Sequence, residues 1–94
     1  MAEFDWALTP ESRERIGQQI MLRHELPELP LPVEKVSFLD GCKLYLRGGW
    51  LIIRFSGTEP RVRIFAEAET AAQAEELVRI AAEHTGLPFP PERM

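Results

Sequence analysis

The residues best suited to chemistry in this sequence lie in one short run, RFSGTEP, at positions 54–60. The guanidinium of Arg54 is a planar donor with a permanent charge, and the hydroxyls of Ser56 and Thr58 are rotatable donors. Because Gly57 has no side chain, it can take a positive φ, so that consecutive amide N–H groups point at one anion. Phosphate needs several donors that converge on its oxygens. The run therefore predicts a phosphate-binding loop.

A second guanidinium, that of Arg63, follows this loop. Arg54 ends one expected strand and Arg63 lies in the returning strand, so the two side chains are expected to face each other and to reach one phosphate. Two arginines so placed repel each other unless an anion is present. Arg61 shares a strand face with Arg63, and its role stays open. An ion pair of Arg63 with Glu67 is disfavoured, since four residues of a strand span roughly 13 Å.

The alternative to phosphate binding is a surface turn, because Ser, Gly, Thr and Pro are common turn residues whatever their function. The flanking arginines favour a binding site. Glu59 is expected to point away from the loop and to accept hydrogen bonds that brace it, because a carboxylate directed inward would repel phosphate. His24 and His84 have no second His, Cys or carboxylate at ligand spacing, so this chain is expected to bind no metal or other cofactor.

The length of 94 residues fits one domain, over residues 1–94, and the composition of 45% hydrophobic and 28% charged residues indicates that it folds. The single cysteine, Cys42, cannot form an internal disulfide and is expected to pack in a strand. No stretch approaches the roughly 18 apolar residues of a membrane span. Residues 1–6 hold two acids where a signal peptide would hold basic residues. We therefore expect a cytoplasmic protein with no membrane partner.

The charge distribution favours a small anionic ligand over a nucleic acid. The net charge of −4 and the isoelectric point near 5.2 argue against a protein that must offset a polyanion over a broad face. The sequence also gives no sign of a basic, aromatic-studded surface. Positive charge is instead local, because arginines stand close together at positions 47, 54, 61 and 63. Such a cluster suits one phosphate better than a duplex.

A helix is predicted at each end of the chain. Thr9 followed by Pro10 is a typical helix start, so the first helix is expected over about residues 10–24. Three prolines in residues 26–32 exclude helix and indicate an extended linker.

The second helix is expected over residues 70–85, because Thr70 and Gln73 form a capping box and apolar residues then repeat at helical spacing. The tail at 87–94 holds three prolines and is expected to lack a fixed position.

Between the helices, over residues 33–69, the apolar pattern changes to period two. The candidate strands are residues 33–39, 42–46, 50–55 and 62–68. Asp40-Gly41 and Gly48-Gly49 are hairpin turn signals. The strand from Trp50 is apolar on both faces, which is typical of a central strand covered on both sides, by helices on one and by another domain on the other. The expected fold is α+β: a four-stranded antiparallel sheet with helices packed on one face.

The loop and its neighbours also resemble a known family. RFSGTEP, preceded by DGCK at 40–43 and GW at 49–50 and followed by VRIFAEAE at 62–69, is similar to the last domain of the phosphohexomutases, which are phosphoglucomutases and phosphomannomutases and include the phosphoglucosamine branch. The resemblance spans about residues 33–86 and implies a TATA-binding-protein-like arrangement. It also implies that five residues bind the phosphate of the sugar that is not being transferred: Arg54, Ser56, Gly57, Thr58 and Arg63.

In that family, a phosphorylated serine, a magnesium site of aspartates and a sugar-reading loop belong to the other domains, and none of them is in this chain. The resemblance thus implies a C-terminal domain that clamps a hexose phosphate at carbon 1 or carbon 6, works with the remaining domains and their Mg²⁺, and is inactive alone. The alternative is a stand-alone module that binds an anion or a protein without chemistry. Nucleic-acid binding on the open sheet face is disfavoured by the acidic balance.

Overall fold

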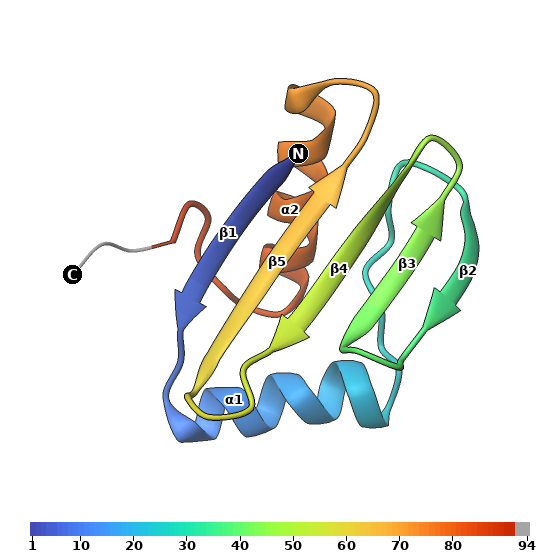
Figure 1. The fold of residues 1–94 in the computed structure, drawn as a ribbon. Helices are drawn as coiled ribbons and strands as arrows, with labels where there is room; N and C mark the ends of the chain where they lie inside the picture. Colours follow the sequence, from blue (N-terminus) through green and yellow to red (C-terminus); the bar gives the residue numbers. More distant parts are fainter. Residues whose placement is uncertain (92–94) are drawn as a thin grey trace.

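The computed structural model describes residues 1–91, which form one antiparallel sheet with helices packed on it (Figure 1). The sheet order is β1-β5-β4-β3-β2. The strands are β1 (Ala2–Ala7), β2 (Val33–Ser37), β3 (Cys42–Leu46), β4 (Gly49–Phe55) and β5 (Arg61–Glu67). The helices are α1 (Pro10–Gly17), its π-helical continuation η1 (Gln18–Leu22), and α2 (Ala71–His84). The predicted α+β class is confirmed, with five strands instead of the predicted four.

The additional strand is β1, which the sequence analysis did not predict. It pairs with β5 from Ala2 opposite Ala66 to Ala7 opposite Arg61. Trp6 is buried on the core side of β1, while Asp5 lies on the opposite side of the sheet. In its sequence, AEFDWA, acidic and aromatic residues alternate as in a half-buried strand, but the segment is short and carries two acids. Because β1 covers the outer side of β5, the strand that follows the loop lies inside the sheet.

The two hairpins β2–β3 and β3–β4 depend on glycines with a positive φ. Gly41 has φ 75° before β3, and Gly48 has φ 92° in the two-residue turn between β3 and β4. This second turn consists of Arg47 and Gly48, one residue earlier than the predicted Gly48-Gly49, so that Gly49 begins β4. A Cβ at Gly49 would collide with the carbonyl oxygen of Glu67 in β5. Glycine at position 49 thus permits close pairing of β4 with β5.

The helices begin where the sequence predicts. The Thr9 side chain accepts a hydrogen bond from the Ser12 amide at the start of α1, and the predicted capping box of Thr70 and Gln73 is present at the start of α2. The first helix ends at Leu22, short of the expected residue 24. Residues 26–32 contain no helix or strand, in keeping with the three prolines of this segment.

The sheet has one covered face and one open face. On the covered face, α2 packs against β5, β1 and β4, and the side chains of Ile16 and Ile20 from the first helix are fully buried. In Figure 1, α2 lies behind the sheet and α1 crosses beneath the strand ends. Among residues 1–91, no element packs on the other side, which we call the open face. Its central members alternate with the core residues: Glu3, Asp5, Lys43, Tyr45, Trp50, Ile52, Arg54, Arg61, Arg63 and Phe65.

The segment after α2 is held against the start of the chain. The Trp6 ring nitrogen donates a hydrogen bond of 2.7 Å to the Pro88 carbonyl oxygen, and Phe89 packs edge-on against Phe4 with ring centroids 4.9 Å apart. The expectation that the tail lacks a fixed position is therefore wrong for residues 87–91, and residues 92–94 lie outside the described part. Within the described chain, no helix is long and apolar enough to cross a membrane.

Candidate functional site

The candidate loop joins β4 to β5, and its ends are fixed by the register of these strands. Arg54 lies directly opposite Arg63, and Phe55 lies opposite Val62. Because side chains alternate across a strand, Val62 and Ile64 are buried on the covered face while Arg54, Arg61 and Arg63 lie on the open face. The two guanidiniums that the sequence analysis placed on either side of the loop thus belong to cross-strand neighbours on one face.

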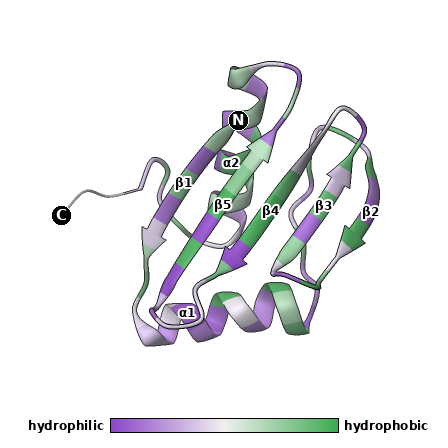
Figure 2. Cartoon of the chain, viewed as in Figure 1, coloured by the Kyte–Doolittle hydropathy of each residue, from purple (hydrophilic) through white to green (hydrophobic). Residues whose placement is uncertain are grey.

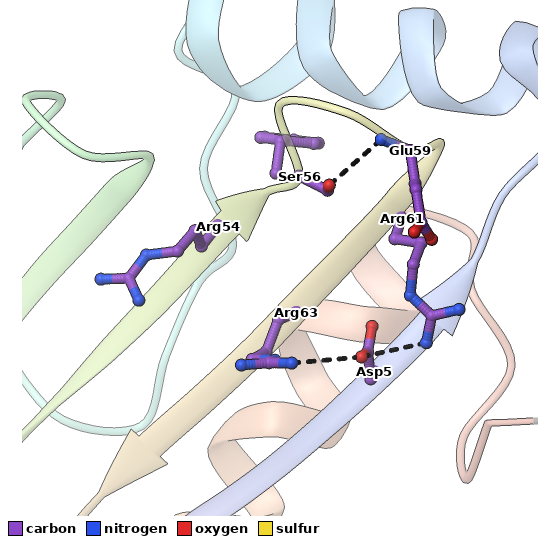
Figure 3. Close-up of a pocket in the computed structure, with 7 residues that line it drawn as sticks. Asp5, Arg54, Ser56, Glu59, Arg61 and Arg63 are labelled. Carbon is purple, nitrogen blue, oxygen red and sulfur yellow. Dashed lines mark hydrogen bonds and ion pairs between the residues drawn. The ribbon is translucent and has the colours of Figure 1, made fainter.

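A cavity of about 320 Å³ opens beside this loop (Figure 3). Its lining includes three of the predicted phosphate-binding residues, Arg54, Ser56 and Arg63, together with Arg61, whose role the sequence left open. The remaining lining residues are Asp5, Phe55 and Glu59. Gly57 and Thr58 do not line it and are exposed at the tip of the loop. Asp5 comes from β1 and was not a predicted site residue.

Ser56 organises the loop from within. Its hydroxyl oxygen accepts hydrogen bonds from the amides of Thr58, at 3.3 Å, and Glu59, at 3.2 Å. Its own amide donates to the Arg61 carbonyl oxygen at 3.1 Å. The hydroxyl proton of Ser56 is not used in these contacts, so it remains able to donate to a ligand.

Two expectations for the loop are wrong. Glu59 lines the cavity rather than pointing away from it, and the loop is braced by Ser56 instead of by the Glu59 carboxylate. Gly57 is absent from the described glycines with a positive φ, which are Gly41, Gly48 and Gly86. A Cβ at Gly57 would also meet no atom within 4 Å. Neither backbone conformation nor crowding within the described chain therefore requires glycine at position 57.

Every arginine of the cavity has a carboxylate partner. Arg61 Nη2 lies 3.0 Å from Asp5 Oδ2, and the same oxygen lies 3.5 Å from Arg63 Nη2. The hydrogen bond from Arg61 to Asp5 is the largest cause of a raised pKa for Arg61, followed by the charges of Asp5 and Glu59. The disfavoured pairing of Arg63 with Glu67 is not formed, since Arg63 reaches back to β1.

Arg54 is directed away from the other arginines in Figure 3. Its Nη2 lies 2.9 Å from Asp40 Oδ2 in the β2–β3 loop, and its guanidinium carbon lies 5.1 Å from the centre of the Phe65 ring. The Nε of Arg54 is buried without a hydrogen-bond partner. An unpaired buried donor of this kind costs free energy.

The open face around the cavity carries aromatic rings and cations. Trp50 and Phe65 meet edge-on with ring centroids 5.9 Å apart, and the Lys43 ammonium lies 4.6 Å from the centre of the Tyr45 ring. Figure 2 shows β4 as mostly hydrophobic beside the more hydrophilic start of β5. Aromatic rings and cations thus lie side by side on this face, but its arginines are paired with acidic side chains. The expectation of no nucleic-acid partner stays a prediction.

Other titratable groups are placed outside this site. Cys42 is fully buried in β3, and burial raises the pKa of its thiol to about 11. The His84 ring nitrogen Nε2 lies 2.8 Å from the Glu25 carbonyl oxygen, which fastens the linker to α2. His24 stacks on Phe38 with ring centroids 4.0 Å apart. Within residues 1–91, no group of three or more His, Cys, Asp or Glu is placed to hold a metal ion.

Comparison with known proteins shows what the chain is similar to. Residues 11–84 match the family model for the C-terminal domain of phosphoglucomutase/phosphomannomutase. A phosphoglucomutase/phosphomannomutase of Thermococcus kodakarensis is 41% identical over 46 residues, which is 49% of this chain and 10% of that protein. A probable phosphoglucosamine mutase of Methanococcoides burtonii is 47% identical over 38 residues, 40% of this chain and 9% of that protein.

A third relative is named for a different sugar. A phosphopentomutase of Thermococcus kodakarensis is 38% identical over 55 residues, which is 57% of this chain and 12% of that protein. The chain thus spans about a tenth of the length of the curated relatives that it matches. The matched family region begins at residue 11, so β1 and its Asp5 lie before it.

Proposed function

The chain belongs to the family of phosphoglucomutase/phosphomannomutase C-terminal domains, and on that premise we propose that its cavity binds the phosphate of a phosphosugar that is not being transferred. Arg54 and Arg63 supply the charge, and the Ser56 hydroxyl and the backbone around Gly57 and Thr58 supply further donors. In the parent enzyme this contact closes the domain over a hexose 1-phosphate or 6-phosphate while the phosphoryl group is transferred elsewhere.

The cross-strand pairing of Arg54 with Arg63 on the open face is the observation that carries this proposal. Two like charges directly opposite each other destabilise a sheet, so each guanidinium needs an anionic partner. In this structure Asp40 and Asp5 are those partners, and a phosphate could replace them. Ser56 adds a hydroxyl on the same cavity. Arg61 adds a third guanidinium, which we assign to the same ligand.

The exposed tip of the loop supports a close approach by a ligand. Gly57 is not required by the fold of the free domain, as its φ and its surroundings show. A missing side chain at this position leaves the backbone of the loop tip accessible, and backbone amides are common phosphate donors. The Thr58 and Glu59 amides would have to exchange the Ser56 hydroxyl oxygen for the phosphate. We propose that the loop tip moves against the phosphate together with the Thr58 hydroxyl.

The names of the relatives suggest which part of a phosphosugar the domain recognises. They include a phosphoglucomutase/phosphomannomutase, phosphoglucosamine mutases and a phosphopentomutase. The sugars in these names differ, whereas all of them carry phosphate. We therefore propose that this domain recognises the phosphate, and that the remaining domains of a cytoplasmic parent enzyme choose the sugar and hold Mg²⁺.

The proposal is tested by titrating the chain with glucose 6-phosphate and with inorganic phosphate while recording amide NMR spectra. The amides of residues 54–58 and 61–63 should shift with saturation. Replacing the charge in Arg63→Gln should weaken binding about ten- to a hundredfold, because hydrogen bonds to charged groups are worth roughly 1.5–3 kcal/mol.

Arg47→Gln is the matched control. Arg47 lies in the turn between β3 and β4, at the far end of β4 from the loop, and pairs with Glu34 at 3.4 Å. The Arg47→Gln variant loses the same charge without a change in the cavity, so its affinity for phosphate should stay within about twofold of that of the unchanged chain. Shifts that avoid the loop, or equal losses in both variants, would contradict the assignment of the phosphate to this cavity.

A further inference from the structure

Asp5 shares the cavity with the arginines, although neither the family match nor the loop motif contains it. It lies in β1 directly opposite Arg63, and its side chain is 32% exposed. One carboxylate oxygen, Oδ2, contacts both Arg61 and Arg63, at 3.0 and 3.5 Å. In Figure 3, Asp5 lies between these two guanidiniums. The donors that a phosphate would use are thus already engaged by a carboxylate of the same chain.

The charges form a row across the sheet. Asp5, Arg63 and Arg54 occupy paired positions on β1, β5 and β4, and Asp40 contacts Arg54 from the other side. Each arginine of the like-charged pair therefore has an aspartate on its outer flank. In this arrangement, the two guanidiniums turn away from each other instead of converging. A phosphate held between them must draw at least one of them away from its aspartate.

A carboxylate and a phosphate compete for the same guanidinium donors. One is planar and the other tetrahedral, but both are oxyanions that accept paired N–H groups. A phosphate dianion in the cavity also lies close to the charge of Asp5, which repels it. Both effects oppose binding. Glu59 lines the cavity too, but it engages none of the three arginines in an ion pair.

We propose that Asp5 is a resident counter-ion that phosphate must displace from Arg61 and Arg63, so that it sets the affinity of the site. The inference rests on the proposed phosphate-binding function. An internal carboxylate keeps both arginines gathered at the cavity when no ligand is bound, and it takes them back when the phosphate leaves. Such easy exchange suits an enzyme in which the phosphate at either end of the sugar occupies the site at different times.

The test compares Asp5→Asn with Glu3→Gln, using inorganic phosphate at pH 8 and low ionic strength. Both variants remove one negative charge from β1. Glu3 contacts Arg63 at 3.6 Å and is 45% exposed, but it does not line the cavity. Asp5→Asn should bind phosphate about three- to tenfold more tightly than the unchanged chain, whereas Glu3→Gln should differ by less than about twofold.

Each outcome decides between the two proposals. Weaker binding in Asp5→Asn would show that the carboxylate only positions the arginines and would overturn the displacement idea, as would equal gains in both variants. Loop shifts in the unchanged chain test phosphate binding itself, independently of the ratio between variants. If none of the three proteins responds to phosphate, both proposals fail. Asp5→Ser, which also removes the charge, serves if the asparagine variant does not fold by circular dichroism.

Discussion

At the scale of single residues, the side chain that the sequence could not place is one that comes from a strand far away in the chain. Arg54, Ser56 and Arg63 were predictable, because the hydroxyl and both guanidiniums lie in one run with strand alternation on either side. Asp5 was not, because it reaches the cavity only through the pairing of β1 with β5, far apart in sequence. A linear pattern gives the face of a residue but not its neighbour on another strand.

Cys42 provides a prediction at the same scale. Its buried thiol keeps its proton up to a pKa of about 11, whereas the unfolded chain releases that proton near the ordinary value of 9.0. Between these values the unfolded state binds fewer protons, so the free energy of unfolding falls as the pH rises, by at most about 1.4 kcal/mol per pH unit. Cys42→Ala should remove this component.

The measurement is urea unfolding of both proteins at pH 8, 9 and 10. Below pH 8 the thiol is protonated in both states and contributes no pH dependence. Parallel declines in the two proteins above pH 9 would mean that other groups cause the alkaline loss. A steeper decline in the unchanged chain is the expected result.

At the scale of elements, the main difference between the predicted fold and the structure is strand β1, which the sequence did not predict. The hairpins and α2 follow from local signals, namely the glycines of the turns and the capping box. β1 has no turn partner beside it, since α1, β2, β3 and β4 separate it from β5 in the chain. Its place depends on long-range burial of Trp6, which no local signal specifies.

The two tryptophans test the importance of this strand. Trp6 is 3% exposed and donates a hydrogen bond to Pro88, whereas Trp50 lies partly exposed on the open face. Trp6→Phe should destabilise the fold by about 1–3 kcal/mol, because it removes volume from the core and leaves the Pro88 carbonyl without its donor. Trp50→Phe should cost less. Circular dichroism during urea unfolding compares both variants by the same signal, and a larger loss for Trp50→Phe would contradict the role of β1.

At the scale of the whole molecule, the fold is a two-layer structure with one layer uncovered. The described residues extend over 34 × 29 × 19 Å, which matches a sheet with one layer of helices. The sequence predicted that β4 is covered on both faces. In the structure of residues 1–91, helices cover one face of β4 and the other face is open. The open face bears the candidate cavity.

The chain alone should bind phosphate without catalysing transfer. Incubation with glucose 1-phosphate, glucose 1,6-bisphosphate and Mg²⁺ should produce no glucose 6-phosphate by ³¹P NMR, because this chain spans only about a tenth of its relatives. Addition of EDTA should leave the phosphate affinity unchanged, since the proposed donors are guanidiniums, a hydroxyl and amides. Turnover by the purified chain, or a metal-dependent affinity, would contradict this division of roles.

The burial of Cys42 has a practical consequence for fluorescence measurements of domain motion. It is the single thiol of the sequence and is fully shielded, so a cysteine introduced at the exposed Arg47 would be the one site that reacts with a maleimide dye. Because this turn lies at the far end of β4 from the cavity, a fluorophore attached there can report reorientation of the domain by energy transfer without obstructing the ligand.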